Sequence, residues 1–92
     1  MDVPIRVLVA EDFDLLREDL CELIARQADM EMVGDASTGK EMVALALQVP
    51  HDVILMDIEM ESLNAGIQAA EHIVDMKAGE KIIFLTAHET DN

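Results

Sequence analysis

Four residues with oxygen-bearing side chains stand directly after short apolar runs of the sequence. They are Glu11, Asp12, Asp57 and Thr86. If these runs form neighbouring strands of one parallel sheet, their carboxyl ends meet at one edge, with adjacent strands about 4.8 Å apart. Ligands of open α/β sheets bind outside such strand ends. Three carboxylates and a hydroxyl would then share one pocket.

Carboxylates this close raise one another's pKa or require a cation. The best candidate is Mg²⁺ (or Mn²⁺), because Mg²⁺ takes oxygen ligands, accepts one or two carboxylates and keeps several waters. Beside such a metal, the Asp57 carboxylate can attack a phosphoryl group and form an acyl phosphate, while the Thr86 hydroxyl donates to the phosphoryl oxygens. The alternative is that each residue is ordinary strand-end polarity, with Asp12 capping the next helix. The four together at one sheet edge favour the functional interpretation.

The hydrophobic pattern predicts the elements that must position these residues. Short apolar runs predict strands at residues 5–10, 30–36, 52–56 and 81–85. Helical periodicity predicts helices at residues 13–28, 38–49 and 65–77. The predicted inward residues of the first helix are Leu16, Leu20, Leu23, Ile24 and Ala28, and those of the third are Ile67, Ala70, Ile73 and Val74. Strict alternation of strands and helices indicates a parallel sheet with helical crossovers.

Composition limits the possible classes of protein. The 92 residues suit one small domain, and 51% apolar content with 2% aromatic content predicts an aliphatic core. A formal charge of −14 repels phosphate backbones, so we expect no direct nucleic-acid binding. The single Cys21 suits a reducing compartment. No segment is long enough to span a membrane and no signal peptide is evident, so we expect a cytoplasmic protein without membrane attachment.

Three stretches resemble the receiver domain of bacterial two-component response regulators. They are Val7-Leu8-Val9-Ala10-Glu11-Asp12, Asp52-Val53-Ile54-Leu55-Met56-Asp57-Ile58-Glu59-Met60 and Ile83-Phe84-Leu85-Thr86-Ala87. The resemblance implies a flavodoxin-like α/β fold with strand order 2-1-3-4 and helices on both faces. It also implies a signalling phosphoacceptor rather than an enzyme, with a sensor histidine kinase as its partner in a phosphorelay.

The resemblance further assigns roles to individual residues. Asp57 corresponds to the phosphoacceptor, and Thr86 to the switch hydroxyl. Asp12 corresponds to a direct Mg²⁺ ligand, Glu11 to a water-mediated one, and the backbone carbonyl of Glu59 completes the protein ligands. The Glu59 side chain and His88 occupy positions that tune the lifetime of the phosphoryl group in this family.

The sequence departs from the family pattern in two places. Glu61 stands where members of this family usually have proline, and Gly66 comes one residue later than usual, so we expect an altered loop after Asp57. The family has five strand–helix units, whereas this sequence lacks the fourth helix, fifth strand and fifth helix, together with a Lys that pairs with the phosphoryl group. Lys77 and Lys81 lie before or at the start of the fourth strand, at its opposite end from Thr86, and cannot replace the missing Lys. We therefore expect residues 1–92 to form an incomplete receiver that binds metal but is impaired in switching.

Besides phosphoryl reception, one other function stays open and one is disfavoured. We expect self-association through the exposed edge of the fourth strand or the uncovered sheet face. An alternative function is therefore a protein-interaction or dimerisation module of receiver fold without phosphoryl chemistry. A flavin or dinucleotide binder is disfavoured, because Glu11 and Asp12 occupy the position of the glycine-rich phosphate loop.

Overall fold

The computed structural model describes residues 3–85, in which strands and helices alternate strictly. The elements are β1 (Ile5–Ala10), α1 (Asp14–Ala25), β2 (Met30–Ala36), α2 (Gly39–Gln48), β3 (Val53–Asp57), α3 (Ala65–Met76) and β4 (Ile82–Leu85). All pairings are parallel and the strand order is β2-β1-β3-β4. The structure thus confirms the predicted flavodoxin-like sheet of order 2-1-3-4.

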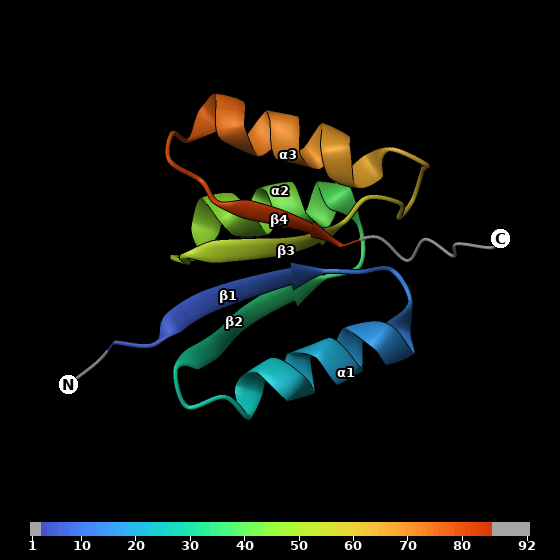
Figure 1. The fold of residues 1–92 in the computed structure, drawn as a ribbon. Helices are drawn as coiled ribbons and strands as arrows, with labels where there is room; N and C mark the ends of the chain where they lie inside the picture. The colour runs from blue at the N-terminus through green and yellow to red at the C-terminus, as the bar shows by residue number, and fades with distance from the viewer. Residues whose placement is uncertain (1–2, 86–92) are drawn as a thin grey trace, which may run out of the picture.

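The sheet separates two apolar clusters. Helices α2 and α3 cover one face and α1 covers the other (Figure 1). Leu8 and Met56 belong to the cluster under α2 and α3, whereas Val7 and Val9 belong to the one under α1 with Ile24. Because successive strand residues point to opposite faces, a strand covered on both sides must be apolar at every position. This explains why β1 and β3, in the middle of the sheet, are mostly apolar in sequence.

Helix α1 is shorter than the periodicity predicts. It ends at Ala25, not at residue 28. The backbone N–H of Gln27 donates to the carbonyl of Ile24 at 3.0 Å, a tightened turn that leaves the helical path. The chain then enters β2, and Asp29 accepts a hydrogen bond from Ile5 at 2.9 Å. The prediction of residue 28 was wrong because the start of β2 stops the helix first.

The predicted inward faces of two helices are also partly wrong. Leu16 and Leu23 of α1 are 36% and 55% exposed, and Ile67 and Val74 of α3 are 39% and 48% exposed. Helix α1 lies over β1 and β2, so only the side that carries Ile24 is covered. Spacing identifies an apolar face, but the neighbouring elements decide how much of that face is buried.

Helix α2 begins with a side-chain N-terminal cap. The Thr38 hydroxyl accepts a hydrogen bond from the backbone N–H of Glu41 at 3.0 Å. The Glu41 carboxylate returns to the N–H and hydroxyl of Ser37, one residue earlier than in a standard capping box. The hydrogen bonds from Ser37 lower the pKa of Glu41. Thr38 and Glu41 therefore form a capping box whose reciprocal contact is shifted by one residue.

A buried polar pair lies between the segments that precede β3 and β4, at the edge away from the predicted pocket. The His51 ring is 2% exposed; its Nε2 lies 2.7 Å from Oε1 of Glu80 and its Nδ1 lies 2.6 Å from the carbonyl of Val49. Lys77 contacts the other carboxylate oxygen of Glu80 at 3.5 Å. Lys77 therefore lies at this edge, as its position before β4 predicts.

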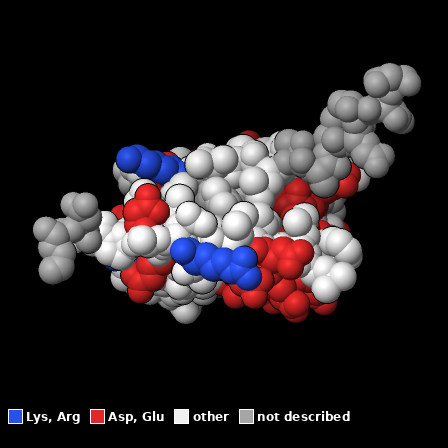
Figure 2. Space-filling model, turned by 60° about the horizontal axis from the view of Figure 1, so that its bottom comes forward, with Lys and Arg blue, Asp and Glu red and all other residues white. Residues whose placement is uncertain are grey.

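Acidic residues outnumber basic ones in the sequence by 20 to 6. Figure 2, which brings the α1 side of the molecule forward, shows uncharged side chains over much of this face, acidic groups toward both ends, and one basic side chain lying across the middle next to acidic groups. Within residues 3–85, none of the helices has the length and apolar character needed to cross a membrane.

Candidate functional site

Three carboxylates meet at the carboxyl ends of β1 and β3. One oxygen each from Glu11, Asp12 and Asp57 lies within 4.8 Å of the others. Glu11 and Asp57 are 4% and 6% exposed, whereas Asp12 is exposed. The structure therefore brings together the three acids predicted from the sequence, with Asp12 on the solvent side. We call these three residues the acidic cluster.

Glu11 is held by hydrogen bonds at three of its polar groups. Its backbone N–H donates to the carbonyl of Ala36 at 3.0 Å, and its carboxylate accepts from the N–H of Phe13 at 3.0 Å. Its carbonyl accepts from the Arg17 guanidinium at 2.9 Å. Helix α1 has Phe13 at its N-cap and no side-chain cap. Asp12 is therefore not the helix cap considered as an alternative, and its carboxylate points to the cluster.

Asp57 is the last residue of β3 and pairs with Leu85 of β4. The chain then returns close to it, because the N–H of Gly66 donates to the carbonyl of Ile58 at 2.7 Å. A Cβ atom on Gly66 would lie 1.9 Å from the carbonyl oxygen of Asp57. Only glycine fits this position. The later position of Gly66 is thus compatible with a closely packed loop.

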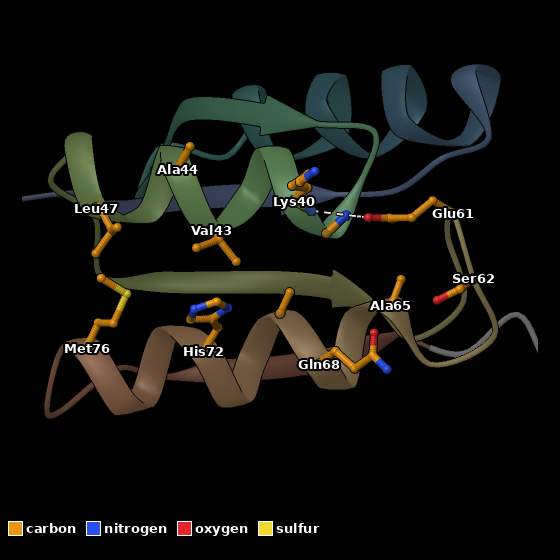
Figure 3. Close-up of a pocket in the computed structure, with 12 residues that line it drawn as sticks. Lys40, Val43, Ala44, Leu47, Glu61, Ser62, Ala65, Gln68, His72 and Met76 are labelled. Atoms are coloured by element: carbon orange, nitrogen blue, oxygen red, sulfur yellow. Dashed lines mark hydrogen bonds between the residues drawn. The ribbon is translucent and has the colours of Figure 1, made fainter.

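Glu61 fixes the same loop from its other end. Its carboxylate accepts hydrogen bonds from the N–H groups of Gly39 and Lys40 at 2.7 and 3.2 Å, at the N-terminus of α2 (Figure 3). Burial opposes ionisation of Glu61, yet these hydrogen bonds leave its pKa lowered. A carboxylate is favoured at a helix N-terminus, because unpaired backbone N–H groups donate hydrogen bonds to it and the positive end of the helix dipole attracts its charge. At the position where the resemblance implies proline, this chain uses a carboxylate to attach the loop to α2.

The acidic cluster disfavours three negative charges at once. Burial raises the pKa of Glu11, and the charge of Asp57 raises it further, against a hydrogen bond from Phe13. Burial likewise raises the pKa of Asp57, and Asp12 adds to this, against hydrogen bonds that involve Glu11 and the N–H of Glu59. Both shifts favour binding of a proton or a cation. An all-oxygen donor set of this kind fits a hard divalent cation such as Mg²⁺.

Of the other residues predicted for the site, only Glu59 lies within the described residues. Glu59 is exposed and follows Asp57 by two residues, so its backbone lies beside the acidic cluster. Thr86 and His88 lie outside the described residues. The sequence did not predict the contacts that Arg17 makes with Glu11 and Asp35, or those of Glu61 with the N-terminus of α2. The i, i+3 spacing of Asp14 and Arg17 was the one local signal, since the other partners are distant in sequence.

Comparison with known proteins assigns the sequence to a family. The family model of the response regulator receiver domain matches residues 7–92. The chain belongs to this family. The acidic cluster and the β2-β1-β3-β4 sheet of this receiver are consistent with a family whose members carry an acidic Mg²⁺ pocket on a flavodoxin-like fold.

Curated relatives and solved structures agree with this assignment. The receiver is 41% identical over 88 residues to the transcriptional regulatory protein LiaR of Bacillus subtilis, covering 96% of this chain and 41% of LiaR. It is 43% identical over 86 residues to the protein-glutamate methylesterase/protein-glutamine glutaminase of Thermotoga maritima, covering 94% of this chain and 24% of that protein. The chain thus spans less than half the length of these two relatives.

Two solved structures show the likeness in space. The response regulator domain of Thermotoga maritima CheB superposes with a TM-score of 0.83 at 43% identity, covering 91% of this chain and 61% of that one. A LuxR-family response regulator from Aurantimonas sp. SI85-9A1 gives a TM-score of 0.86 at 26% identity, covering 94% of this chain and 61% of that one.

Proposed function

We propose that this receiver accepts a phosphoryl group on the carboxylate of Asp57. The observation that carries the proposal is the acidic cluster, in which Asp57 lies at a rigid strand end with two further carboxylates within 4.8 Å. A buried carboxylate with a raised pKa, held beside charge partners at a strand end, has the character of a functional group rather than of surface polarity.

The acidic cluster would hold Mg²⁺ (or Mn²⁺). Asp12 would be a direct ligand together with Asp57, Glu11 would act through a water, and the backbone carbonyl of Glu59 would complete the set. When bound, the ion neutralises charge on the phosphoryl oxygens. The exposure of Asp12 leaves the cluster open to an entering ion.

Phosphoryl transfer then uses groups that the chain itself positions. A carboxylate oxygen of Asp57 attacks the phosphorus, and the bond from phosphorus to the donor's histidine nitrogen breaks. That imidazole keeps the electron pair and takes up a proton, and Asp57 becomes an acyl phosphate. The packing of Gly66 against the Asp57 carbonyl holds the acceptor in place during this step.

The partner proposed for this reaction is a sensor histidine kinase, in the cytoplasm. The chain itself is proposed to act as a signalling phosphoacceptor and not as an enzyme with a separate substrate. Thr86 is proposed as the switch hydroxyl, and the Glu59 side chain and His88 as groups that tune the lifetime of the acyl phosphate. Loss of phosphoryl-group lifetime in a Glu59→Ala variant would support the tuning role.

The test uses acetyl phosphate as a small-molecule donor, with intact mass as the readout. We expect the chain to gain the mass of one phosphoryl group in Mg²⁺ and to gain none in excess chelator. The Asp57→Asn variant should not be labelled. The Asp52→Asn variant is the matched control and should be labelled normally, because Asp52 pairs with Arg6 and lies outside the acidic cluster. Labelling of the Asp57→Asn variant would contradict the proposal.

We propose self-association as a second property, on the exposure of β4. No described strand pairs with the outer edge of β4, and Ile83 and Phe84 are 54% and 40% exposed. Ile83 pairs in register with Leu55, so it lies on the α1 side of the sheet, where α1 lies mainly over β1 and β2. An open strand edge beside an apolar face is a site for pairing with a second copy.

Light scattering at high micromolar concentration tests this property. We expect a dimer or larger assembly that grows with salt, because salt screens the repulsion between chains of charge −14. An Ile83→Lys variant should weaken the assembly, whereas Leu15→Lys, at a 64% exposed position on α1, should not. A monodisperse monomer would contradict the expectation.

A separate test concerns the interaction-module alternative. If the Asp57→Asn substitution left partner binding, and the dependence of that binding on kinase activity, unaltered, this alternative would be favoured over phosphoryl reception.

A further inference from the structure

The guanidinium of Arg17 joins three parts of the chain next to the acidic cluster. Its Nη1 donates to the carbonyl oxygen of Glu11 at 2.9 Å, its Nη2 to Asp14 at 2.8 Å, and its Nε to Asp35 at 3.1 Å. The side chain is 16% exposed. It therefore lies between the β1–α1 loop, the first turn of α1 and the end of β2.

The contact with Glu11 acts on the peptide that leads into Asp12. The carbonyl that Arg17 holds belongs to the peptide bond between Glu11 and Asp12. A peptide group is planar, so fixing its oxygen fixes the direction in which the chain enters Asp12. Asp12 is the exposed member of the acidic cluster. Its position depends on the backbone that precedes it.

We propose that Arg17 is a positioning residue for the metal site, which acts by orienting the Glu11–Asp12 peptide so that the Asp12 carboxylate faces Asp57. This rests on the proposed function, in which the acidic cluster binds Mg²⁺. Partners outside the ligand set that orient metal ligands typically change metal affinity by about 10- to 100-fold when they are removed.

The sign of the effect separates positioning from charge. If Arg17 acted only as a nearby positive charge, its removal would make the potential at the acidic cluster more negative and Mg²⁺ would bind more tightly. If Arg17 positions Asp12, its removal weakens binding. Asp14 and Asp35 already neutralise the guanidinium, which leaves orientation as its main contribution.

The experiment titrates Mg²⁺ into the chain by calorimetry and compares two variants, Arg17→Gln and Arg17→Lys. We expect both to bind Mg²⁺ about tenfold more weakly, since Lys keeps the charge but not the planar fork that reaches three partners. Arg26→Gln is the matched control, because it removes the same charge from a side chain that is 69% exposed at the C-terminal end of α1. This variant should bind Mg²⁺ as the wild type does. Thermal unfolding checks that each variant is folded at the titration temperature.

A second readout separates positioning from general damage. In labelling with acetyl phosphate, the Arg17 variants should need about tenfold more Mg²⁺ for half-maximal rate and should reach the wild-type rate at saturation. Unchanged or tighter Mg²⁺ binding by the Arg17→Gln variant, with the wild type binding normally, would overturn the role of Arg17 alone. Failure of the wild type to bind Mg²⁺ would overturn this role and the proposed metal site together. Full affinity in the Arg17→Lys variant would show that the planar fork with its three partners is not needed, and would also overturn positioning.

Discussion

Replacing Asp57 with asparagine should stabilise the metal-free protein, although it removes the proposed acceptor. The acidic cluster holds carboxylate oxygens within 4.8 Å of one another. At that separation and an effective dielectric constant of about 20, two unit charges repel by about 3.5 kcal/mol. Burial and this repulsion raise the pKa of both Asp57 and Glu11, so a retained proton already relieves part of the cost. We therefore expect a net gain of about 1–3 kcal/mol at pH 8, below the full pair energy.

The gain should depend on pH with a definite sign. A carboxyl whose pKa is raised in the folded state binds its proton more tightly there, so its contribution to stability is lost as pH rises through that pKa. An asparagine side chain does not ionise, so the advantage of the Asp57→Asn variant is largest at pH 8 and disappears toward pH 4. Mg²⁺ should narrow the difference at pH 8, because it stabilises only the form that binds it.

Unfolding followed by far-ultraviolet circular dichroism measures this, since the chain has no Trp or Tyr to report by fluorescence. With excess chelator at pH 8, each kcal/mol should raise Tm by about 4–8 °C for a domain of this size. Asp52→Asn is the control of opposite sign. Arg6 lowers the pKa of Asp52 to about 2, so that variant should lose stability at pH 8 and the loss should fade as pH drops below 4. An Asp57→Asn variant less stable than wild type at pH 8, or equally stabilised at both pH values, would refute the reasoning.

Three further changes test the packing around the site. Gly66→Ala should cost about 1–3 kcal/mol in urea unfolding and slow labelling by acetyl phosphate, because a Cβ would lie 1.9 Å from the Asp57 carbonyl oxygen; unchanged stability would show that the loop can relax. Glu61→Gln should cost about 0.5–1 kcal/mol and speed hydrogen exchange at the N-terminus of α2, with no change in exchange counting against the cap. Glu80→Leu should cost about 1–3 kcal/mol, because it leaves a ring nitrogen of buried His51 without its partner, and a neutral result would mean that water replaces the carboxylate.

The sequence allowed the sheet to be predicted better than the helix faces. A strand covered on both sides must be largely apolar, so β3 stands out as an apolar run up to Asp57 and β1 as a run broken only by Arg6. Helical spacing could not show that Leu23 and Val74 are exposed, because burial depends on which elements lie opposite. The end of α1 depends likewise on where β2 begins.

The acidic cluster was predictable for a topological reason, and its supports were not. Glu11, Asp12 and Asp57 each follow an apolar run, and parallel neighbours place those ends at one edge. Arg17 and Glu61 could not be placed from the sequence, because most of their partners lie 6 to 22 residues away and belong to other elements. The proline position therefore signalled a changed loop without showing that a carboxylate holds it.

The most direct test of the account locates the phosphoryl group chemically. After incubation with acetyl phosphate and Mg²⁺, borohydride reduction converts an aspartyl phosphate to homoserine, which peptide mass spectrometry can place in the sequence. The account predicts homoserine at Asp57 alone, and none when Mg²⁺ is withheld. Homoserine at another acid, or none at Asp57 under conditions in which the wild type binds Mg²⁺, would contradict it.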